Sequence, residues 1–262
     1  MKKNDGRHLL QSSKSAYWLS ILCLTVFLLF SLLFAVSVGA VQIPLKNVYE
    51  IVLGNIGNWF SHLFRGTEYV PISGAVGDVV WYIRMPRLLL ALTIGTGLAV
   101  CGVIMQAVVK NPLAEPYVLG ISSGASLGAT SAVLLGIGAA FGANSVGVMA
   151  CLGAFGISIG VVAISNIGGR SNSVKLLLAG MALSSVCSAF SNLIVYFAHD
   201  KEGIQSVTYW MMGSTAGASW PKLAVIVPVV IAGTLFFLTQ CRTLNLMLLG
   251  DESAITLGKD LH

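Results

Sequence analysis

The sequence of 262 residues is 56% hydrophobic and only 10% charged, and its mean hydropathy is +0.85. A soluble domain usually carries about a quarter charged residues, so this composition excludes a water-soluble globular fold and predicts a protein whose solvent is largely lipid. The five cysteines form no C-x-x-C pair and lie in or beside apolar segments. They are therefore expected to be small hydrophobes rather than disulfide partners or metal ligands.

Long stretches without any Asp, Glu, Lys or Arg mark the expected membrane spans. A bilayer core needs about 20 apolar residues as a helix, and a charge at its centre costs about 2.5–3.5 kcal/mol on insertion scales. The sequence therefore predicts an all-α integral membrane protein, a polytopic helix bundle that forms a single transmembrane domain over residues 1–262. Six spans are expected, at about 16–41, 88–109, 117–137, 145–167, 174–198 and 223–240.

The first span follows a basic N-terminus that includes Lys2, Lys3 and Arg7. Its apolar run is about twice the length of a signal-peptide core, and five more spans follow it, so an uncleaved anchor is expected. With the N-terminus in the cytoplasm, nine of the 15 Lys and Arg residues fall on the cytoplasmic side, as the positive-inside rule favours. The nine are Lys2, Lys3, Arg7, Lys14, Lys110, Arg170, Lys175, Arg242 and Lys259.

Residues 46–65, after the first span, carry apolar side chains at helical spacing and predict an amphipathic helix at the membrane interface. Small residues recur at every fourth position in the third span, and the fourth and fifth spans repeat the pattern. Such stripes favour close helix packing over the lining of a pathway. They comprise Gly120, Gly124, Gly128, Ala132 and Gly136; Gly156 and Gly160; and Gly180, Ser184, Ser188 and Asn192.

Several enzyme classes lack support in the sequence. No G-x-x-x-x-G-K-[ST] loop is present, so energy from ATP would have to come from a partner. No H-E-x-x-H motif or Cys/His cluster indicates a metal site, and no cofactor or catalytic residue is expected. The segment 120–124 matches G-x-S-x-G, but Pro116 and a membrane helix replace the strand and helix that the hydrolase motif requires. An intramembrane serine protease would need a histidine within a later span, whereas His199 lies at a helix end.

Three segments, read in order, together resemble one family. The first is RMPR at 84–87 with Gln106, NPLAEP at 111–116 and LGISSG at 119–124; the second is LLLAG at 176–180 with YWMMGS at 209–214; the third is GDE at 250–252 with Ala254, Leu257 and Gly258. They resemble the FecCD-type permeases of ABC importers for iron–siderophore, haem and cobalamin. The resemblance covers about residues 80–262. Family members have about ten spans in two related halves, so the chain is expected to be C-terminally incomplete.

The resemblance implies site residues on both sides of the membrane. Arg84 and Arg87 would bind carboxylates on an extracytoplasmic substrate-binding protein. Asn111, Leu113, Asn172 and Ser173 would form a cytoplasmic gate. The segment 246–262 would couple to the ATPase subunit, whose closure would reach the gate as rigid-body movement. The coupling residues would be Gly250, Asp251, Glu252, Ala254, Leu257 and Gly258.

The function implied is transport of an iron(III)–siderophore or similar metal chelate by a permease subunit that is not itself an enzyme. The expected partners are a cytoplasmic ABC ATPase, a substrate-binding protein, a second copy of the chain and membrane lipid, with no nucleic acid. The expected location is the inner membrane of a bacterium or archaeon. A cobalamin or haem importer is the alternative cargo class, and the protease is a remote alternative. An ion-coupled transporter would need ionisable residues in its spans, which this sequence lacks.

Overall fold

The computed structural model describes residues 5–39, 42–66, 68, 70–72, 74–169 and 172–248, and its regular elements in these ranges are all helices. Among the described residues, five helical stretches are long and apolar enough to cross a membrane: Lys14–Ser37, Ala75–Val109, Ala139–Ser165, Ser173–Phe197 and Trp220–Thr239. The prediction of an all-helical polytopic membrane protein is therefore confirmed. Four of these stretches begin within a few residues of predicted spans, whereas the second begins earlier than predicted.

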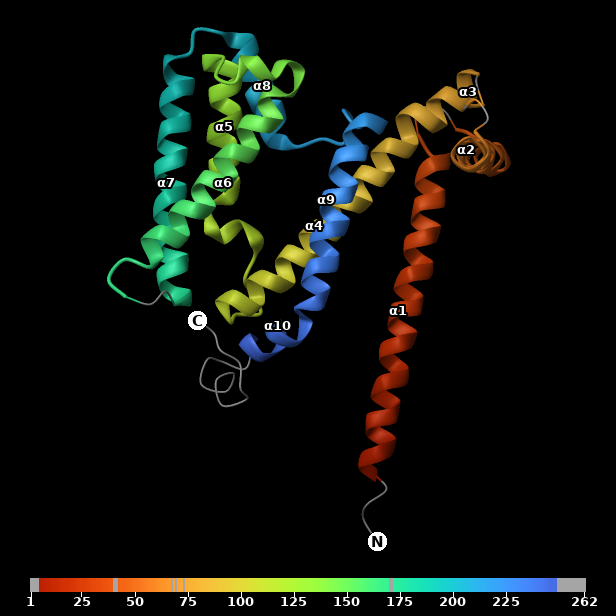
Figure 1. Ribbon diagram of the computed structural model, residues 1–262, viewed down its shortest axis with the longest axis horizontal. Coiled ribbons are helices and arrows are strands. Elements are labelled where there is room, and N and C mark those ends of the chain that lie inside the picture. The colour runs from red at the N-terminus through yellow and green to blue at the C-terminus, as the bar shows by residue number, and fades with distance from the viewer. Residues whose placement is uncertain are drawn as a thin grey trace. The chain divides into compact units, whose positions relative to one another are not determined.

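The chain divides into two compact units, which are described separately below. The first contains α1 (Asp5–Ser37), α2 (Leu45–Arg65), α3 (Ala75–Asp78), a π-helix η1 (Val79–Arg84) and the first residues of α4 (Met85–Val109) and α9 (Trp220–Thr239). Figure 1 shows α2 end-on beside the C-terminal end of α1. The core of this unit joins α1, α2 and η1, and it is formed by Val36, Ile43, Val48, Ile51 and Val80.

Helix α2 is amphipathic, as predicted. Its buried side, which includes Val48 and Ile51, packs into this core, whereas Trp59, Phe60 and Leu63 are exposed. Two polar side chains of α2 hold the segment that follows it. The Asn55 side chain is fully buried and accepts a hydrogen bond from the backbone N–H of Ile72 at 2.7 Å, and the Asn58 amide donates to the Val70 carbonyl at 2.8 Å. The amphipathic helix therefore also serves as a support for the loop over 70–72.

The second unit contains the remainder of α4 and α9 together with the other elements: η2 (Pro116–Leu119), α5 (Ile121–Leu135), η3 (Ala139–Asn144), α6 (Ser145–Ser165), α7 (Ser173–Phe197), α8 (Lys201–Met212) and α10 (Cys241–Leu248). Helix α5 is the centre of this unit, because it packs against α6, α7 and α8. Figure 1 shows α5, α6 and α7 side by side, with α8 across one end. The residues of α5 that are buried are all small: Gly124, Gly128, Ala129, Thr130, Ser131 and Ala132.

Helix α5 is shorter than the third span that the sequence predicts. Glycines in the left-handed region stand at both of its ends, Gly120 at φ 76° and Gly136 at φ 66°. Pro116 opens a separate 3₁₀ turn before it, so the helical segment over 117–137 is divided. The helix proper has 15 residues, which at 1.5 Å per residue gives a length of about 22 Å. It is thus shorter than the five spanning stretches, and backbone breaks rather than charges set its length.

The π-helix η1 has a local cause in the sequence. In its register the backbone N–H of Met85 donates to the carbonyl of Val80, five residues earlier. The next N–H in that series would come from residue 86, which is a proline and has no backbone donor. The Trp81 carbonyl instead accepts a hydrogen bond from the indole Nε1–H of Trp220 at 2.9 Å. π-Turns inside helices are rare and often occur at functional sites.

Candidate functional site

The turn after α4 contains two of the predicted gate residues, Asn111 and Leu113. Helix α4 ends at Val109, and the next residue, Lys110, is in the left-handed region at φ 57°. The Asn111 N–H then donates to the Gln106 carbonyl at 3.2 Å. The Asn111 side chain accepts from the Leu113 N–H at 2.9 Å, and the Gln106 side chain donates to the Pro112 carbonyl at 2.9 Å. These bonds fix a compact turn.

The start of α7 contains the other two, Asn172 and Ser173. Asn172 is the N-cap: its side chain accepts from the Lys175 N–H at 2.8 Å, which satisfies one of the donors that every helix start leaves free. The Ser173 hydroxyl donates to the Val108 carbonyl, in the last turn of α4, at 3.2 Å. The second candidate segment is thus bonded to the helix that carries the first.

An apolar cluster strengthens this junction. Met105 and Val109 of α4 and Ala114 of the turn are buried together, with Leu119 and Leu177 packed against them. Leu113, by contrast, points away and leaves 85% of its surface exposed. The structure therefore joins the end of α4, its turn and the beginning of α7 into one contact region, which we call the α4–α7 junction. Within this region Leu113 is the most exposed of the large apolar side chains that the structure describes.

The two arginines predicted to bind a partner protein have different surroundings. Arg84, the last residue of η1, is partly buried, and its Nη1 donates to the backbone carbonyls of Val36 and Ser37 at the end of α1, the latter at 3.0 Å. Arg87, in the first turn of α4, is exposed, and its side chain has no bonding partner within the described part of the chain. Of these two arginines, Arg87 is the one whose guanidinium has no bonding partner among the described residues.

The small residues predicted to support packing lie where helices approach most closely. A Cβ added to Gly124 would lie 2.5 Å from the Gly153 carbonyl oxygen, and one on Gly128 would overlap the Met149 carbonyl. Gly120 faces α7, where a Cβ would lie 2.7 Å from the Ser184 hydroxyl. On α6 the glycine that takes part in this contact is Gly153, which lies outside the predicted stripe of Gly156 and Gly160. Gly156 has open space, and Gly160 meets only the Leu183 side chain.

The hydrolase-like segment 120–124 meets no catalytic partner within the part of the chain that the structure describes. The Ser123 hydroxyl forms a hydrogen bond with the Ser184 hydroxyl of α7 at 2.9 Å, either one being the donor. A serine nucleophile needs a general base within hydrogen-bond reach, and another serine cannot serve as one. The small-residue stripe predicted for the fifth span packs against other helices over only part of its length. Gly180 and Ser184 pack on η2 and α5, whereas Ser188 and Asn192 are exposed.

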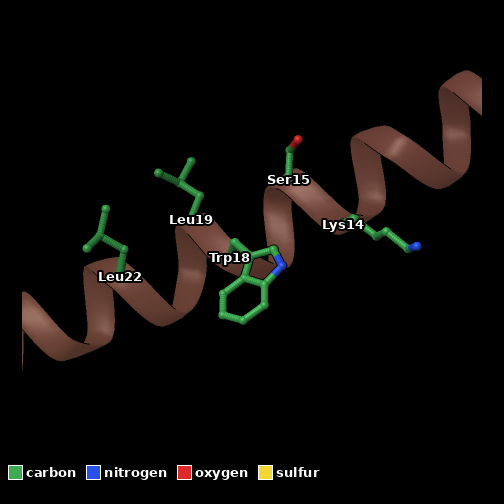
Figure 2. A pocket seen from close by; sticks show the side chains of 5 residues that line it. All are labelled: Lys14, Ser15, Trp18, Leu19 and Leu22. Atoms are coloured by element: carbon green, nitrogen blue, oxygen red, sulfur yellow. The ribbon is translucent and has the colours of Figure 1, made fainter.

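Two further regions bear on the candidate site. The predicted coupling residues Gly250, Asp251, Glu252, Ala254, Leu257 and Gly258 lie outside the described residues, as does most of 246–262. The described part of that segment is the end of α10. A shallow hollow also lies along α1, formed by Lys14, Ser15, Trp18, Leu19 and Leu22. Figure 2 shows that all five side chains project from a single helix, so this hollow is a helix surface and not an enclosed site.

The residues that the sequence did not reveal are mostly partners across helices. Val36, Ser37 and Gly39 surround Arg84, Gly153 faces Gly124, and the Trp81 carbonyl receives Trp220. Most of these contacts use backbone atoms, and a backbone atom carries no signature in the sequence. Gly153 alone could have been predicted from the sequence, because it lies one helical turn before Gly156 and Gly160, which form the predicted small-residue stripe of the fourth span.

Comparison with protein families gives one match that covers most of the chain. The model of the FecCD transport family matches residues 27–262. Permease proteins of the vitamin B12 import system, named BtuC, from Shigella boydii serotype 18 and Escherichia coli O139:H28 are each 35% identical over 254 residues. These alignments cover 96% of this chain and 68% of each relative.

A solved structure is also similar. It is described as an inward-facing conformation of a metal-chelate type ABC transporter, and it matches with a TM-score of 0.69 at 26% identity. The match covers 92% of this chain and 66% of the solved chain. The chain therefore spans about two thirds of the length of the proteins it resembles.

Proposed function

Because the chain belongs to the FecCD transport family, we propose that it is a membrane-spanning permease subunit of a binding-protein-dependent ABC importer. The match of the family model over residues 27–262 is the observation that carries this proposal. The family is one of transport proteins, and the chain is a transporter subunit rather than an enzyme. ATP would be hydrolysed by a separate ATPase, and cargo would arrive on an extracytoplasmic binding protein. Two copies of the permease would enclose the pathway, with the N-terminus of each in the cytoplasm.

The proposed cargo is a corrinoid of the vitamin B12 type, in place of the iron–siderophore that the sequence analysis put first. The curated relatives reported above are vitamin B12 import permeases at 35% identity over 96% of this chain. The solved relative is described as metal-chelate type. A corrinoid is itself a cobalt ion held in an organic macrocycle, so both descriptions share one chemical class. Ferric siderophore and haem are the other members of that class to test.

The α4–α7 junction is the proposed cytoplasmic gate. Its support is geometric: Asn111 fixes the turn after α4, Asn172 caps α7, and the Ser173–Val108 hydrogen bond joins the two. A region joined in this way would move as one body when a partner subunit pushes on it. Leu113, exposed at the turn, is the apolar side chain that such a partner would cover. The segment 250–258 is the proposed coupling contact with the ATPase subunit.

The experiment is a pull-down of the tagged chain from its native membranes, followed by reconstitution with the recovered subunits. Mass spectrometry should identify an ABC ATPase and a substrate-binding protein. Proteoliposomes should then accumulate labelled cyanocobalamin only when ATP is enclosed with the ATPase, and they should exclude ferric siderophore and haemin. Uptake of ferric siderophore instead would reassign the cargo within the same machinery. Recovery of neither partner, with no ATP-dependent uptake of any of the three compounds, would refute the importer assignment.

A further inference from the structure

Helix α2 has a second apolar face besides the one in the core. Its buried residues are Val48, Ile51 and Asn55. On the adjoining side, successive helical turns present large apolar side chains that leave 38–76% of their surface exposed. These side chains are Tyr49, Leu53, Ile56, Phe60, Leu63 and Phe64. A surface in contact with water rarely keeps so long an apolar stripe, so this face is expected to be covered.

A cavity lies beside this face, and its wall residues all belong to the first unit. The wall is almost entirely apolar and includes three tryptophans and a tyrosine. Its residues are Ile56 and Trp59 of α2, Trp81 and Tyr82 of η1, and Trp220 and Ala224 of α9. The volume of the cavity is about 510 Å³, within the range of about 300–1,000 Å³ that small-molecule sites have.

The inner wall of the cavity is fixed by the pair Trp81 and Trp220. Their ring centroids are 4.9 Å apart, and the Trp220 indole N–H donates to the Trp81 carbonyl. That N–H is therefore already bonded and offers no donor to a ligand. Trp81 is 8% exposed, whereas Trp59 and Tyr82 are 49% and 48% exposed. The cavity thus has a closed aromatic wall and an open aromatic rim, an arrangement suited to an apolar ligand.

The cavity lies at a boundary of the bilayer. The spanning part of α1 ends at Ser37, where α1 packs against α2, and the spanning helix α9 begins at Trp220, in the cavity wall itself. Trp and Tyr are enriched at this level of membrane proteins, because their rings suit the acyl chains and their polar atoms suit the headgroups. An amphipathic helix there buries its apolar face about 5–10 Å into the same region. The exposed face of α2 and the cavity therefore continue the surface that the spanning helices present to lipid.

We propose that the cavity holds one acyl chain of a phospholipid from the leaflet at this end of α1 and α9, while the exposed face of α2 lies on neighbouring lipids. Val225, next to Ala224 on α9, is 67% exposed, so apolar surface adjoins the cavity on α9 as well as on α2. No charged side chain is among the described residues of the wall, so an acyl chain fits it better than a headgroup. The proposal needs only the membrane and does not rest on the importer function.

The first test uses a photoreactive lipid. The purified protein is placed in nanodiscs of phosphatidylethanolamine and phosphatidylglycerol that contain a small fraction of phosphatidylethanolamine with a diazirine in one acyl chain. After irradiation, mass spectrometry should locate the label on Trp81 in the cavity as well as on Phe64, which is 76% exposed on α2. Because Trp81 is only 8% exposed, lipid that surrounds the protein without entering the cavity should not reach it.

Ala224→Leu should fill part of the cavity and lower the labelling of Trp81, relative to Phe64, at least about tenfold. Ala232→Leu, two turns further along α9 and outside the cavity, is the matched control and should leave the ratio unchanged. Label on Phe64 alone in the parent protein would overturn the proposal, because lipid would then cover α2 without entering the cavity. Label on neither residue would also overturn it, since a second copy or another protein segment would then cover this face. These two results come from the parent protein, so they stand even where Ala224→Leu fails to insert.

The second test measures thermal unfolding in detergent with and without added phosphatidylethanolamine. A ligand that binds the folded protein raises its melting temperature by mass action. The lipid should therefore stabilise the parent protein and Ala232→Leu, and Ala224→Leu should lose most of that shift. Equal shifts in all three proteins would place the lipid elsewhere and overturn the cavity assignment. Neither test involves an ATPase or a binding protein, so failure of the importer assignment would leave both results decisive.

Discussion

The indole N–H of Trp220 lies 2.9 Å from the backbone carbonyl of Trp81, across 139 positions of sequence, and the two ring centroids are 4.9 Å apart. The proline at position 86 creates the need for this bond, because it removes the donor that the π-register would supply to that carbonyl. Trp220, at the start of α9, thereby supplies the hydrogen bond that the backbone of η1, the segment leading into α4, would otherwise lack.

Trp220→Phe should destabilise the protein while keeping most of the ring contact. The Trp81 residue is only 8% exposed, so its carbonyl would be left without a donor in a buried position. The expected cost is about 1–3 kcal/mol of unfolding free energy. Thermal unfolding in detergent, followed by near-ultraviolet circular dichroism, measures it. Trp59→Phe is the matched control, because the Trp59 indole is 49% exposed; an equal loss in both variants would argue against the hydrogen bond.

Gly128→Ala should weaken the packing of α5 on α6. The added methyl group would overlap the Met149 carbonyl, so the two helices would have to separate. Overpacking of this kind costs about 1–3 kcal/mol, which should appear as a lower melting temperature in detergent. Gly156→Ala on the facing helix is the control, since a methyl group there meets nothing within 4 Å. An unchanged melting temperature for Gly128→Ala would contradict the close approach.

Ser123→Ala should leave transport intact. The hydroxyl bonds only to Ser184 in the described chain, so its loss should cost about 0.5–1.5 kcal/mol of stability and no chemistry. ATP-dependent cyanocobalamin uptake should stay close to that of Ser122→Ala, an exposed neighbour. A double-mutant cycle with Ser184→Ala should show coupling between the two hydroxyls. Abolition of function by Ser123→Ala with unchanged stability would revive the serine protease alternative.

Asn172→Ala should fray the first turn of α7. Its side chain accepts the Lys175 N–H, and loss of such a cap costs about 0.5–2 kcal/mol. Hydrogen exchange at Lys175 should accelerate, and Asn172→Ser, which retains a capping oxygen, should keep most of the protection. If the α4–α7 junction is the gate, ATP turnover by the complex should become less tightly coupled to uptake in Asn172→Ala than in Asn172→Ser. Equal exchange in both variants would show that the cap does not hold this turn.

The sequence predicted the spans most accurately where composition alone determines them. Helices α6, α7 and α9 begin at Ser145, Ser173 and Trp220, against predicted starts at 145, 174 and 223. The second spanning stretch begins at Ala75, well before the predicted start at 88. The prediction was too late because Asp78, Arg84 and Arg87 end the charge-free window, whereas the helix continues through them. The length of α5 was missed for the opposite reason: glycine and proline divide an uncharged segment.

The candidate site was less predictable than the fold. The Asn111 and Asn172 turns follow from ordinary turn and cap chemistry, and the structure places each in such a role. That Ser173 bonds to the α4 backbone, or that Arg84 faces the end of α1, depends on contacts more than 45 positions apart in the chain. The amino-acid sequence does not reveal such contacts, because their acceptors are main-chain carbonyls, which every residue has.

The close contact between α5 and α6 has a consequence for biosynthesis. Helix α5 has only 15 residues, and its buried glycines meet the backbone of a helix that follows after a short connection, η3. Such local pairing requires little loop closure and forms quickly. The two helices are therefore expected to leave the insertion machinery as a preformed helical hairpin. Helix α5, which is too short to span the membrane alone, would then enter the lipid together with the longer α6.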